Sequence, residues 1–574
     1  MTTRVILERD VPCTLRDGTV LMADVYRPDD DERYPVLLQR TPYDKTFFPF
    51  TWGCADPTKL ASFGYTVVIQ DCRGRFQSGG EYVPYANEAE DGHDAVQWAA
   101  EQPWSDGRVG MYGASYMAGT QWLAASTAPP ALRAIAPSTS PNDMLEQQVR
   151  RGGAIQTGLL LSWALAATPH DLIRRLGISP ELFQELPALI DDIDDFETWA
   201  KHLPLLPFPP MEQRSPTLSS WLGDVLREDR TPFHEKVSSA HRHPDIAVPA
   251  LQIAGWNDLL LQSDLDHFVA MRSEAGSEDA RRLTRLVVGP WVHATFTGFV
   301  GERDFGFRAA GILLDLREDL TGLHRRWFDA RLKGIPSGID EEPPVKLFVM
   351  GRNRWRNEDE WPPTRAKTQR WHVHASGALS LRPPEASEPS NFTLDPENPV
   401  PTHGGALLMP GQYIRGPREQ APIEARPDVL VFTSEPLTED LEVTGRVRFS
   451  CWIAAETVDT DVVARLCDVG PDGRSFNVMD GIQRARFRDG LYDPKPLTPG
   501  EPTPIEVDLW STSYLFLAGH RIRLQVCASD FPRFDRCPGS GESSTVAKHV
   551  LPQRNKLFHD PARPSHVELP VVAP

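Results

Sequence analysis

The sequence predicts an α/β protein with a mostly parallel sheet, interrupted by a helical insertion and followed by a domain of antiparallel strands. Three parts of its 574 residues differ in pattern. Short β-rich runs alternate with helical runs at first, Leu-rich helical runs broken by prolines follow, and short β-like runs between Pro/Gly/Asp-rich loops fill the rest. Alternating strands and helices favour a parallel sheet covered on both faces, and closely spaced short strands favour a sandwich.

The elements of the first part follow from their hydrophobic patterns. Residues 34–39 (YPVLLQ), 65–70 (YTVVIQ) and 108–112 (RVGMY) are short and β-rich, which is typical of buried strands. Residues 89–100 and 116–126 have a helical composition and complete a strand–helix–strand–helix order. This order predicts one sheet in which these strands run parallel.

Later boundaries are indicated by changes in the pattern. Strands resume at 249–254 (PALQIA) and 285–288 (RLVV), a helix is expected over 315–332, and 375–401 is expected to be a long loop. We therefore divide the chain into four parts. They are a first core part (1–140), a helical cap (141–241), a second core part (242–345) and a C-terminal β domain (346–574).

Composition restricts the partners and the compartment. The net charge of −19 would repel the phosphates of nucleic acids and of anionic membranes. We find no apolar run of the roughly 18 residues that a membrane span needs, and no secretory signal at the N-terminus. The seven cysteines are scattered and never spaced as CxxC. Such cysteines are typical of free thiols in a reducing cytoplasm.

A catalytic serine is indicated by the segment GMYGASYMAG, residues 110–119. Ser115 stands two residues after Gly113, between an expected strand and an expected helix. At such a corner the serine Oγ projects from the carboxyl edge of the sheet, and the helix N-terminus points backbone N–H groups at the reacting atom. The G-x-S-x-G pattern of α/β-hydrolases is incomplete, because Met117 replaces its second glycine. A chance G-x-S is the alternative.

The serine needs a base and an acid, which in α/β-hydrolases follow it in the order acid, then histidine. His293 fits the base because it follows the strand RLVV, although a hydrogen-bonded turn histidine is the alternative. Asp258 fits the acid because it follows an apolar strand and a glycine turn. Asp264 and Asp266 are alternatives, but they fall in the next expected helix, where a solvated face or an N-cap explains them.

An oxyanion hole needs two hydrogen-bond donors. The backbone N–H of Tyr116, directly after the nucleophile, is the first. The second is expected in the loop after the first strand, where Tyr43 carries a phenolic O–H. On composition alone, a packing role explains Tyr43 better.

These motifs together resemble one known family. The segments TPYDK, VIQDCRGRFQSGGEY, VGMYGASYMAGTQW, AGWND and VGPWVH, with GGALL and FLAGHRIRLQV in the last third, are similar to segments of bacterial cocaine esterases and X-prolyl dipeptidyl peptidases. Cephalosporin acylases and α-amino-acid ester hydrolases are relatives of these two groups of enzymes. The resemblance covers nearly the whole chain. It implies an α/β-hydrolase core with an inserted α-helical cap and a C-terminal β jelly-roll domain.

The resemblance also implies roles for single residues. Ser115 is then the nucleophile, Asp258 the acid and His293 the base. The Tyr43 O–H and the Tyr116 N–H form the oxyanion hole. Asp71 and Arg73 also lie in the matching segments, and the resemblance implies a structural role for both.

The substrate pocket is expected to be apolar. The resemblance places Trp52 and Trp163 beside it, and Leu260 stands where the esterase is aromatic, which implies a differently shaped acyl pocket. Leucines of the cap and the C-terminal domain favour an apolar wall, with burial in the cap core as the alternative. These leucines are Leu161, Leu165, Leu407 and Leu408.

The favoured function is a serine hydrolase that cleaves carboxylic esters through an acyl-enzyme, without a metal or an organic cofactor. The expected partner is a small-molecule ester or amide, and a homodimer is an option. An X-Pro dipeptidyl peptidase, or an amidase or β-lactam acylase, is the alternative enzyme. A peptidase would need a carboxylate for the substrate amine, and the acidic run 191–197 is more typical of a solvated face. A carbohydrate-binding protein on an inactive hydrolase scaffold is the non-enzymatic alternative.

Overall fold

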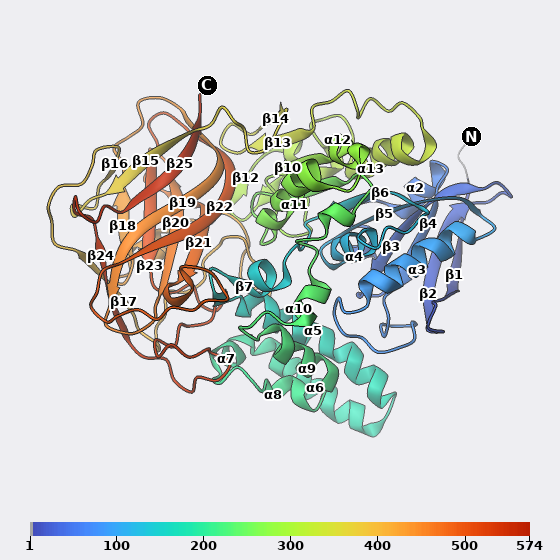
Figure 1. Ribbon diagram of the computed structural model, residues 1–574, viewed down its shortest axis with the longest axis horizontal. Helices are drawn as coiled ribbons and strands as arrows, with labels where there is room; N and C mark the ends of the chain where they lie inside the picture. Colours follow the sequence, from blue (N-terminus) through green and yellow to red (C-terminus); the bar gives the residue numbers. More distant parts are fainter. Residues whose placement is uncertain (1–3, 574) are drawn as a thin grey trace.

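The computed structural model describes residues 4–573, and a large mixed sheet forms the half of the molecule that carries the N-terminus (Figure 1). Its strand order is β1-β2-β4-β3-β5-β6-β9-β10-β13-β14. Neighbours from β4 to β13 run parallel, whereas β1, β2 and β14 are antiparallel to their neighbours. The strands are β1 (Val5–Thr14), β2 (Val20–Pro28), β3 (Tyr34–Thr41), β4 (Thr66–Asp71), β5 (Ser105–Ala114), β6 (Leu132–Ser138), β9 (Leu251–Gly255), β10 (Arg285–Gly289), β13 (Val345–Val349) and β14 (Arg354–Glu358).

Helices cover both faces of this sheet because side chains alternate along each strand. In β3, Leu38 packs in one apolar cluster with Trp122 of α4, whereas Leu37 packs in another with Phe328 of α13. Both faces are thus buried, as the apolar strands predicted. The helices of the core are α1 (Phe48–Thr51), α2 (Pro57–Ser62), α3 (Glu88–Glu101), α4 (Tyr116–Ala125), α11 (Leu261–Glu274), α12 (Glu278–Leu283) and α13 (Leu320–Phe328).

The sequence located most of the central strands but missed β6, which lies between β5 and β9, and strands towards the edges of the sheet. The expected runs correspond to β3, β4, β5, β9 and β10, whereas β1, β2 and β6 were not expected. β1 has charged residues among its apolar ones and lies at an edge, so its pattern differs from that of a buried strand. The expected loop 375–401 contains β16 (Leu379–Ser380) and β17 (Ser390–Leu394), which is a correction. β13 and β14 belong to the large sheet. The strands of the C-terminal domain therefore begin only after Glu358.

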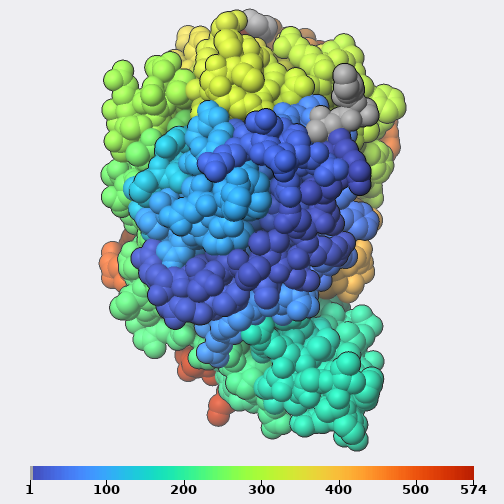
Figure 2. Space-filling model, turned by 90° about the vertical axis from the view of Figure 1, so that its right-hand side faces the viewer, coloured from blue at the N-terminus to red at the C-terminus, as the bar shows by residue number. Residues whose placement is uncertain are grey.

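The segment between β6 and β9 forms a helical cap, whose apolar residues share one buried cluster with residues of the core and of the C-terminal domain. Figure 2 shows it as a projection on one side of the N-terminal part. None of the helices in residues 4–573 has the length and apolar composition that crossing a bilayer requires. The cap helices are α5 (Thr157–Leu176), α6 (Pro180–Asp194), α7 (Phe196–Lys201), α8 (Pro209–Glu212), α9 (Pro216–Val225) and α10 (Pro232–Val237).

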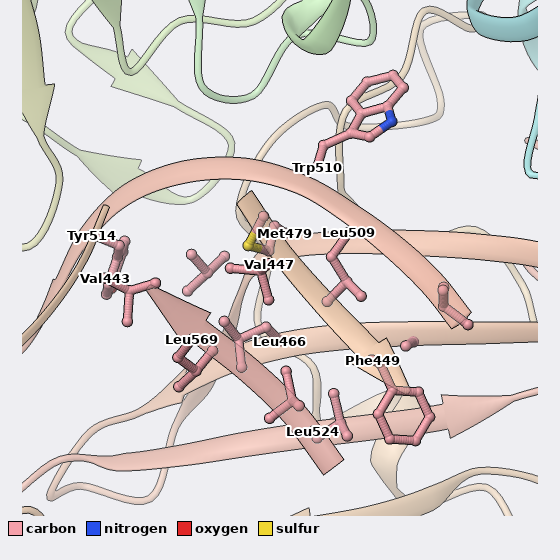
Figure 3. Packing of buried hydrophobic residues seen from close by; sticks show 14 of the residues in the cluster. Val443, Val447, Phe449, Leu466, Met479, Leu509, Trp510, Tyr514, Leu524 and Leu569 are labelled. Atoms are coloured by element: carbon pink, nitrogen blue, oxygen red, sulfur yellow. The ribbon is translucent and has the colours of Figure 1, made fainter. Parts of the chain in front are cut away.

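The C-terminal part packs two antiparallel sheets face to face. Figure 3 shows the shared core, in which Phe449 and Leu569 of one sheet meet Leu466 and Leu524 of the other. The larger sheet contains β15 (Lys367–Val373), β16, β17, β19 (Leu441–Ala455), β22 (Thr503–Phe516), β24 (Gln553–Phe558) and β25 (His566–Val572). The smaller contains β18 (Leu430–Thr433), β20 (Asp461–Val469), β21 (Ser475–Arg484) and β23 (Arg521–Cys527).

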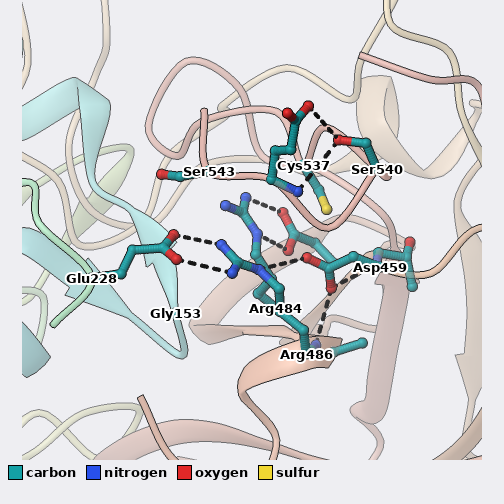
Figure 4. Close-up of polar contacts among 12 residues, drawn as sticks. Gly153, Glu228, Asp459, Arg484, Arg486, Cys537, Ser540 and Ser543 are labelled. Carbon is teal, nitrogen blue, oxygen red and sulfur yellow. Dashed lines mark hydrogen bonds and ion pairs between the residues drawn. The ribbon is translucent and has the colours of Figure 1, made fainter. Parts of the chain in front are cut away.

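Charged groups join the cap to the C-terminal domain. Glu228, just after α9, binds the guanidinium of Arg486 with both carboxylate oxygens, at 3.0 Å and 2.5 Å (Figure 4). Arg486 also reaches Asp459 at 3.1 Å, and only 4% of its side chain is exposed. Although burial alone would raise it, the hydrogen bonds and charge of Arg486 hold the pKa of Glu228 below its usual value. At pH values above the pKa of Glu228, its carboxylate is charged, and the contact with Arg486 holds the cap against the C-terminal domain.

Glu228→Gln is expected to weaken this junction, because it leaves a buried guanidinium with one carboxylate fewer. A lost charge-assisted hydrogen bond of this kind costs about 1–3 kcal/mol. Thermal unfolding at neutral pH should show a lower Tm than in the wild type, whereas Glu501→Gln, which changes an exposed carboxylate of the same domain, should not. Equal Tm values for wild type and Glu228→Gln would contradict this role.

Candidate active site

Ser115 lies at a sharp turn between the last residue of β5 and the first residue of α4. Its φ is 61° and its ψ is −125°, a backbone conformation that non-glycine residues rarely adopt. The turn is fixed by hydrogen bonds, because the Ser115 N–H donates to the Ser138 carbonyl at 3.0 Å and the Ser115 carbonyl accepts from Ala118 N–H at 2.9 Å. This turn is the strand–helix corner that the sequence indicated.

Gly113 has no room for a side chain. Its φ is +136°, and a Cβ there would lie 2.7 Å from the Cβ of Met117 and 3.4 Å from the side chain of Gln39 in β3. The usual pattern has glycine at the position of Met117. Because Met117 carries a side chain that a Cβ at position 113 would meet, glycine is more necessary at 113. The closer conflict is thus with α4 rather than with the neighbouring strand.

Ser115, His293 and Asp258 form a continuous hydrogen-bonded row. The Ser115 Oγ lies 2.7 Å from His293 Nε2, and His293 Nδ1 lies 3.0 Å from Asp258 Oδ2. Asp258 is fully buried, and its Oδ1 accepts from the N–H of Leu260 at 2.6 Å. The loops after β9 and β10 are joined by the N–H of Asn257, which donates to the Trp291 carbonyl at 3.0 Å. Asp258 and His293 are therefore held at one edge of the sheet.

Asp264 and Asp266 do not contact His293. Asp264 is fully buried and accepts from the N–H of Ser140 at 2.9 Å, so the expected solvated face or N-cap is wrong for it. The reason is that α11 packs its Asp264 side against the segment that follows β6. Burial raises the pKa of Asp264 well above its usual value. Asp266 accepts from Gln262 at 2.8 Å within the same helix.

Tyr43 lies in the loop after β3 and faces the site together with Trp163 of α5. The indole N–H of Trp163 donates to the Tyr43 hydroxyl oxygen at 3.0 Å. Burial raises the pKa of Tyr43 to about 12, even though the Trp163 hydrogen bond and Arg75 act in the opposite direction. Since the phenol is neutral and its oxygen accepts from Trp163, its own proton is available for donation.

The backbone N–H of Tyr116 lies at the start of α4, directly after Ser115. As the first residue of α4 its N–H has no carbonyl one turn earlier in the helix to bind. Its phenol O–H donates to Glu88 at 2.9 Å and its oxygen accepts from the N–H of Tyr85 at 2.8 Å. The buried side chain thus fixes the start of α4 beside Ser115.

Asp71 and Arg73 lie in the core behind the site. Asp71 accepts from the N–H of Lys45 at 2.7 Å, and burial raises the pKa of Asp71 to about 7. Arg73 binds Asp91 through its Nε at 2.9 Å. Asp71 therefore supports the loop that carries Tyr43, whereas Arg73 binds α3.

A cavity of about 670 Å³ opens beside Ser115, and a narrower one of about 30 Å³ adjoins it. Both are lined by Ser115, His293, Tyr43, Trp163 and Leu408. The core, the cap and the C-terminal domain therefore all contribute to the walls. Leu260 lines the narrow cavity.

Other expected wall residues lie elsewhere. Trp52 is 38% exposed at the end of α1 and Leu407 is buried in the cap cluster, and neither is among the described residues that line the two cavities. Leu161 and Leu165 pack inside the cap, and the narrow cavity is lined instead by Leu159 and Leu160. Each step along a helix turns a side chain by about 100°. Helix composition alone therefore could not show which leucines face the substrate.

Three basic residues of the larger cavity were not found by sequence reasoning: Arg75, His170 and Arg415. Arg75 donates to the Pro42 carbonyl at 2.9 Å and so fixes the Tyr43 loop. His170 Nε2 accepts from the N–H of Phe76 at 2.9 Å, and burial, with Arg75 as a second cause, lowers the pKa of His170 to about 4. The segment VIQDCRGRFQSGGEY contains Arg75, so that residue could have been found. His170 and Arg415 reach the site only through tertiary packing.

Comparison with known proteins gives matches along almost the whole chain. Residues 17–295 match the X-Pro dipeptidyl-peptidase (S15 family) model, and residues 337–568 match the X-Pro dipeptidyl-peptidase C-terminal non-catalytic domain. A cocaine esterase of Rhodococcus sp. (strain MB1 Bresler) is 37% identical over 582 residues, covering 98% of each chain.

Solved structures share the whole fold. An aminopeptidase from a marine sediment archaeon (Thaumarchaeota archaeon) has a TM-score of 0.82 at 22% identity, covering 100% of this chain and 97% of its own. An α-amino acid ester hydrolase has a TM-score of 0.81 at 24% identity, covering 99% and 97%. The fold is therefore an α/β-hydrolase with a C-terminal β-rich domain, and the chain belongs to the S15 peptidase family that includes cocaine esterase.

Proposed function

We propose that this protein is a serine hydrolase that cleaves carboxylic esters, with Ser115 as nucleophile, His293 as base and Asp258 as acid. The observation that carries the proposal is the row of contacts from Ser115 Oγ to His293 Nε2 at 2.7 Å and from His293 Nδ1 to Asp258 at 3.0 Å. An Nδ1–H donated to a buried carboxylate leaves Nε2 free to accept the serine proton. The relationship to a cocaine esterase supports the same reaction.

The reaction proceeds through an acyl-enzyme. His293 Nε2 takes the proton of Ser115 as Oγ bonds to the ester carbonyl carbon, and the carbonyl oxygen becomes an oxyanion. The Tyr43 O–H and the Tyr116 N–H would donate to that oxygen. When the carbon–alkoxide bond breaks, His293 returns the proton to the leaving alcohol. Water then attacks the acyl-enzyme by the same steps and releases the carboxylic acid.

Neutral acyl groups suit these cavities better than α-amino acyl groups. An α-ammonium placed in an apolar wall needs a buried carboxylate beside it. Among residues 4–573, no Asp or Glu lines either cavity. The acidic run of the cap is engaged elsewhere: Asp192 receives the indole N–H of Trp199 at 3.1 Å, and Glu197 binds the Tyr413 hydroxyl.

The cysteines support a reducing compartment, which we propose to be the cytoplasm. All seven are free and buried. Unpaired thiols persist where glutathione and thioredoxin keep them reduced.

The substrate class is tested by three compounds assayed at one pH: p-nitrophenyl butyrate, phenylglycine methyl ester and Gly-Pro-p-nitroanilide. The cavity walls predict the highest kcat/KM for the butyrate ester, because its acyl group is neutral and apolar. A higher value for the X-Pro amide would show a dipeptidyl peptidase instead. A higher value for the amino ester would indicate an α-amino-acid ester hydrolase.

The assignment of the acid is tested by two matched substitutions. Asp258→Asn should lower kcat by about three to four orders of magnitude, because an amide no longer fixes the histidine tautomer. Asp264→Asn should leave kcat within about threefold of the wild type, because Asp264 does not contact His293 and the amide oxygen of asparagine can still accept the hydrogen bond from Ser140 N–H. Steady-state kinetics of both variants, with Tm as a check on folding, decide the matter. A larger loss in Asp264→Asn would contradict our choice.

A further inference from the structure

One cation of the larger cavity has no protein partner. Arg415 lines this cavity together with Ser115 and His293. Among residues 4–573, no carboxylate lies within 4.0 Å of its guanidinium, and no side-chain hydrogen bond of Arg415 is present. Burial lowers the pKa of Arg415, with the charge of Asp258 acting in the opposite direction. An arginine without a partner in a half-buried wall is costly unless a ligand supplies the missing anion.

The loop that carries Arg415 is held on both sides. Gly405 and Gly416 exchange two backbone hydrogen bonds of 2.8 Å, which close the loop at its base. The N–H of Glu302 donates to the Pro417 carbonyl at 2.8 Å, and the Glu302 carboxylate binds Arg418 at 3.1 Å. These contacts attach the loop to the core segment that follows His293. Arg415 is therefore placed at the cavity by fixed backbone, although it belongs to the C-terminal domain.

The surroundings of Arg415 favour an anion rather than a cation. Arg75, the second guanidinium of this cavity, binds the carbonyls of Pro42 and Ala167 and has no carboxylate within 4.0 Å among the described residues. His170 is neutral at pH 7, and the carboxylate of Asp258 is engaged with His293. Two positive charges with no acidic residue in the wall attract anionic substrates.

The linings of the two cavities suit different parts of an ester. The narrow one is lined by Leu159, Leu160 and Leu260 and by Trp221, and no Asp, Glu, Lys or Arg of residues 4–573 lines it. Its apolar lining favours the acyl side of an ester, of which its volume of about 30 Å³ admits only a few atoms. The larger cavity then takes the alcohol part of the ester, on the side where Arg415 lies.

We propose that the preferred substrates are esters whose alcohol part carries a carboxylate, which Arg415 binds. This inference rests on the proposed ester hydrolysis and names its substrate class. A guanidinium presents paired N–H donors that match the two oxygens of a carboxylate. Binding it would give Arg415 the partner that the protein itself does not provide.

The test compares two butyrate esters of similar shape, 4-carboxyphenyl butyrate and its neutral analogue 4-carbamoylphenyl butyrate. The selectivity is the ratio of their kcat/KM values, measured at pH 7.5 on the full chain. Taking this ratio in each variant cancels the difference in reactivity between the phenols. Arg415→Gln should lower the ratio by about tenfold or more, Arg415→Lys should lower it less, and added salt should lower it in the wild type. Arg382→Gln, an exposed arginine of the same domain, should leave it unchanged.

A ratio that is equal in wild type and Arg415→Gln, with both proteins folded by Tm, would overturn the proposal. A second pair, the mono-p-nitrophenyl ester of adipic acid and the same ester capped as a methyl ester, places the carboxylate on the acyl side. If Arg415→Gln lowers the selectivity for that pair instead, the assignment to the alcohol side is wrong. If the wild type hydrolyses neither butyrate, the proposed esterase function itself fails, irrespective of Arg415.

Discussion

The strained backbone at Ser115 is the constraint on which the rest of the site depends. A φ of 61° is unfavourable for serine, and it persists because β5 and α4 are both fixed by buried neighbours. Gly113 lets α4 approach β5, and Tyr116 anchors the first turn of α4 through Glu88. Arg40, fully buried in β3, binds the same Glu88 at 2.5 Å. The position of the Ser115 Oγ is therefore determined by polar contacts deep inside the core.

The other groups are brought to this oxygen by segments far apart in the sequence. Asp258 and His293 come from loops after adjacent parallel strands, which end at the same edge of the sheet. The cap contributes Trp163, whose hydrogen bond orients the Tyr43 hydroxyl, and the C-terminal domain contributes Arg415. Charged contacts such as that of Glu228 with Arg486 hold the cap on that domain. The substrate space thus exists only when all three parts are docked.

The sequence predicted the row of Ser115, Asp258 and His293 because chain order and strand ends restrict where such residues can lie. It predicted only part of the pocket wall, namely Trp163, Leu260 and Leu408, since the side of a helix that faces a cavity is set by packing. Leu159 rather than Leu161 lines the cavity for this reason. Arg415 gave no local signal, because its loop meets the site only through tertiary contacts with the segment around Glu302. Edge strands such as β1 were missed because their charged residues conceal the alternation.

We infer that the strained turn, by holding Ser115 Oγ against His293 Nε2, makes Ser115 the serine that is activated for acyl transfer. Incubation with a fluorophosphonate probe, followed by peptide mapping by mass spectrometry, tests this claim most directly. We expect one adduct per chain, located on Ser115, and no labelling of the folded Ser115→Ala variant. An adduct on another residue, or unchanged labelling of Ser115→Ala, would contradict the account.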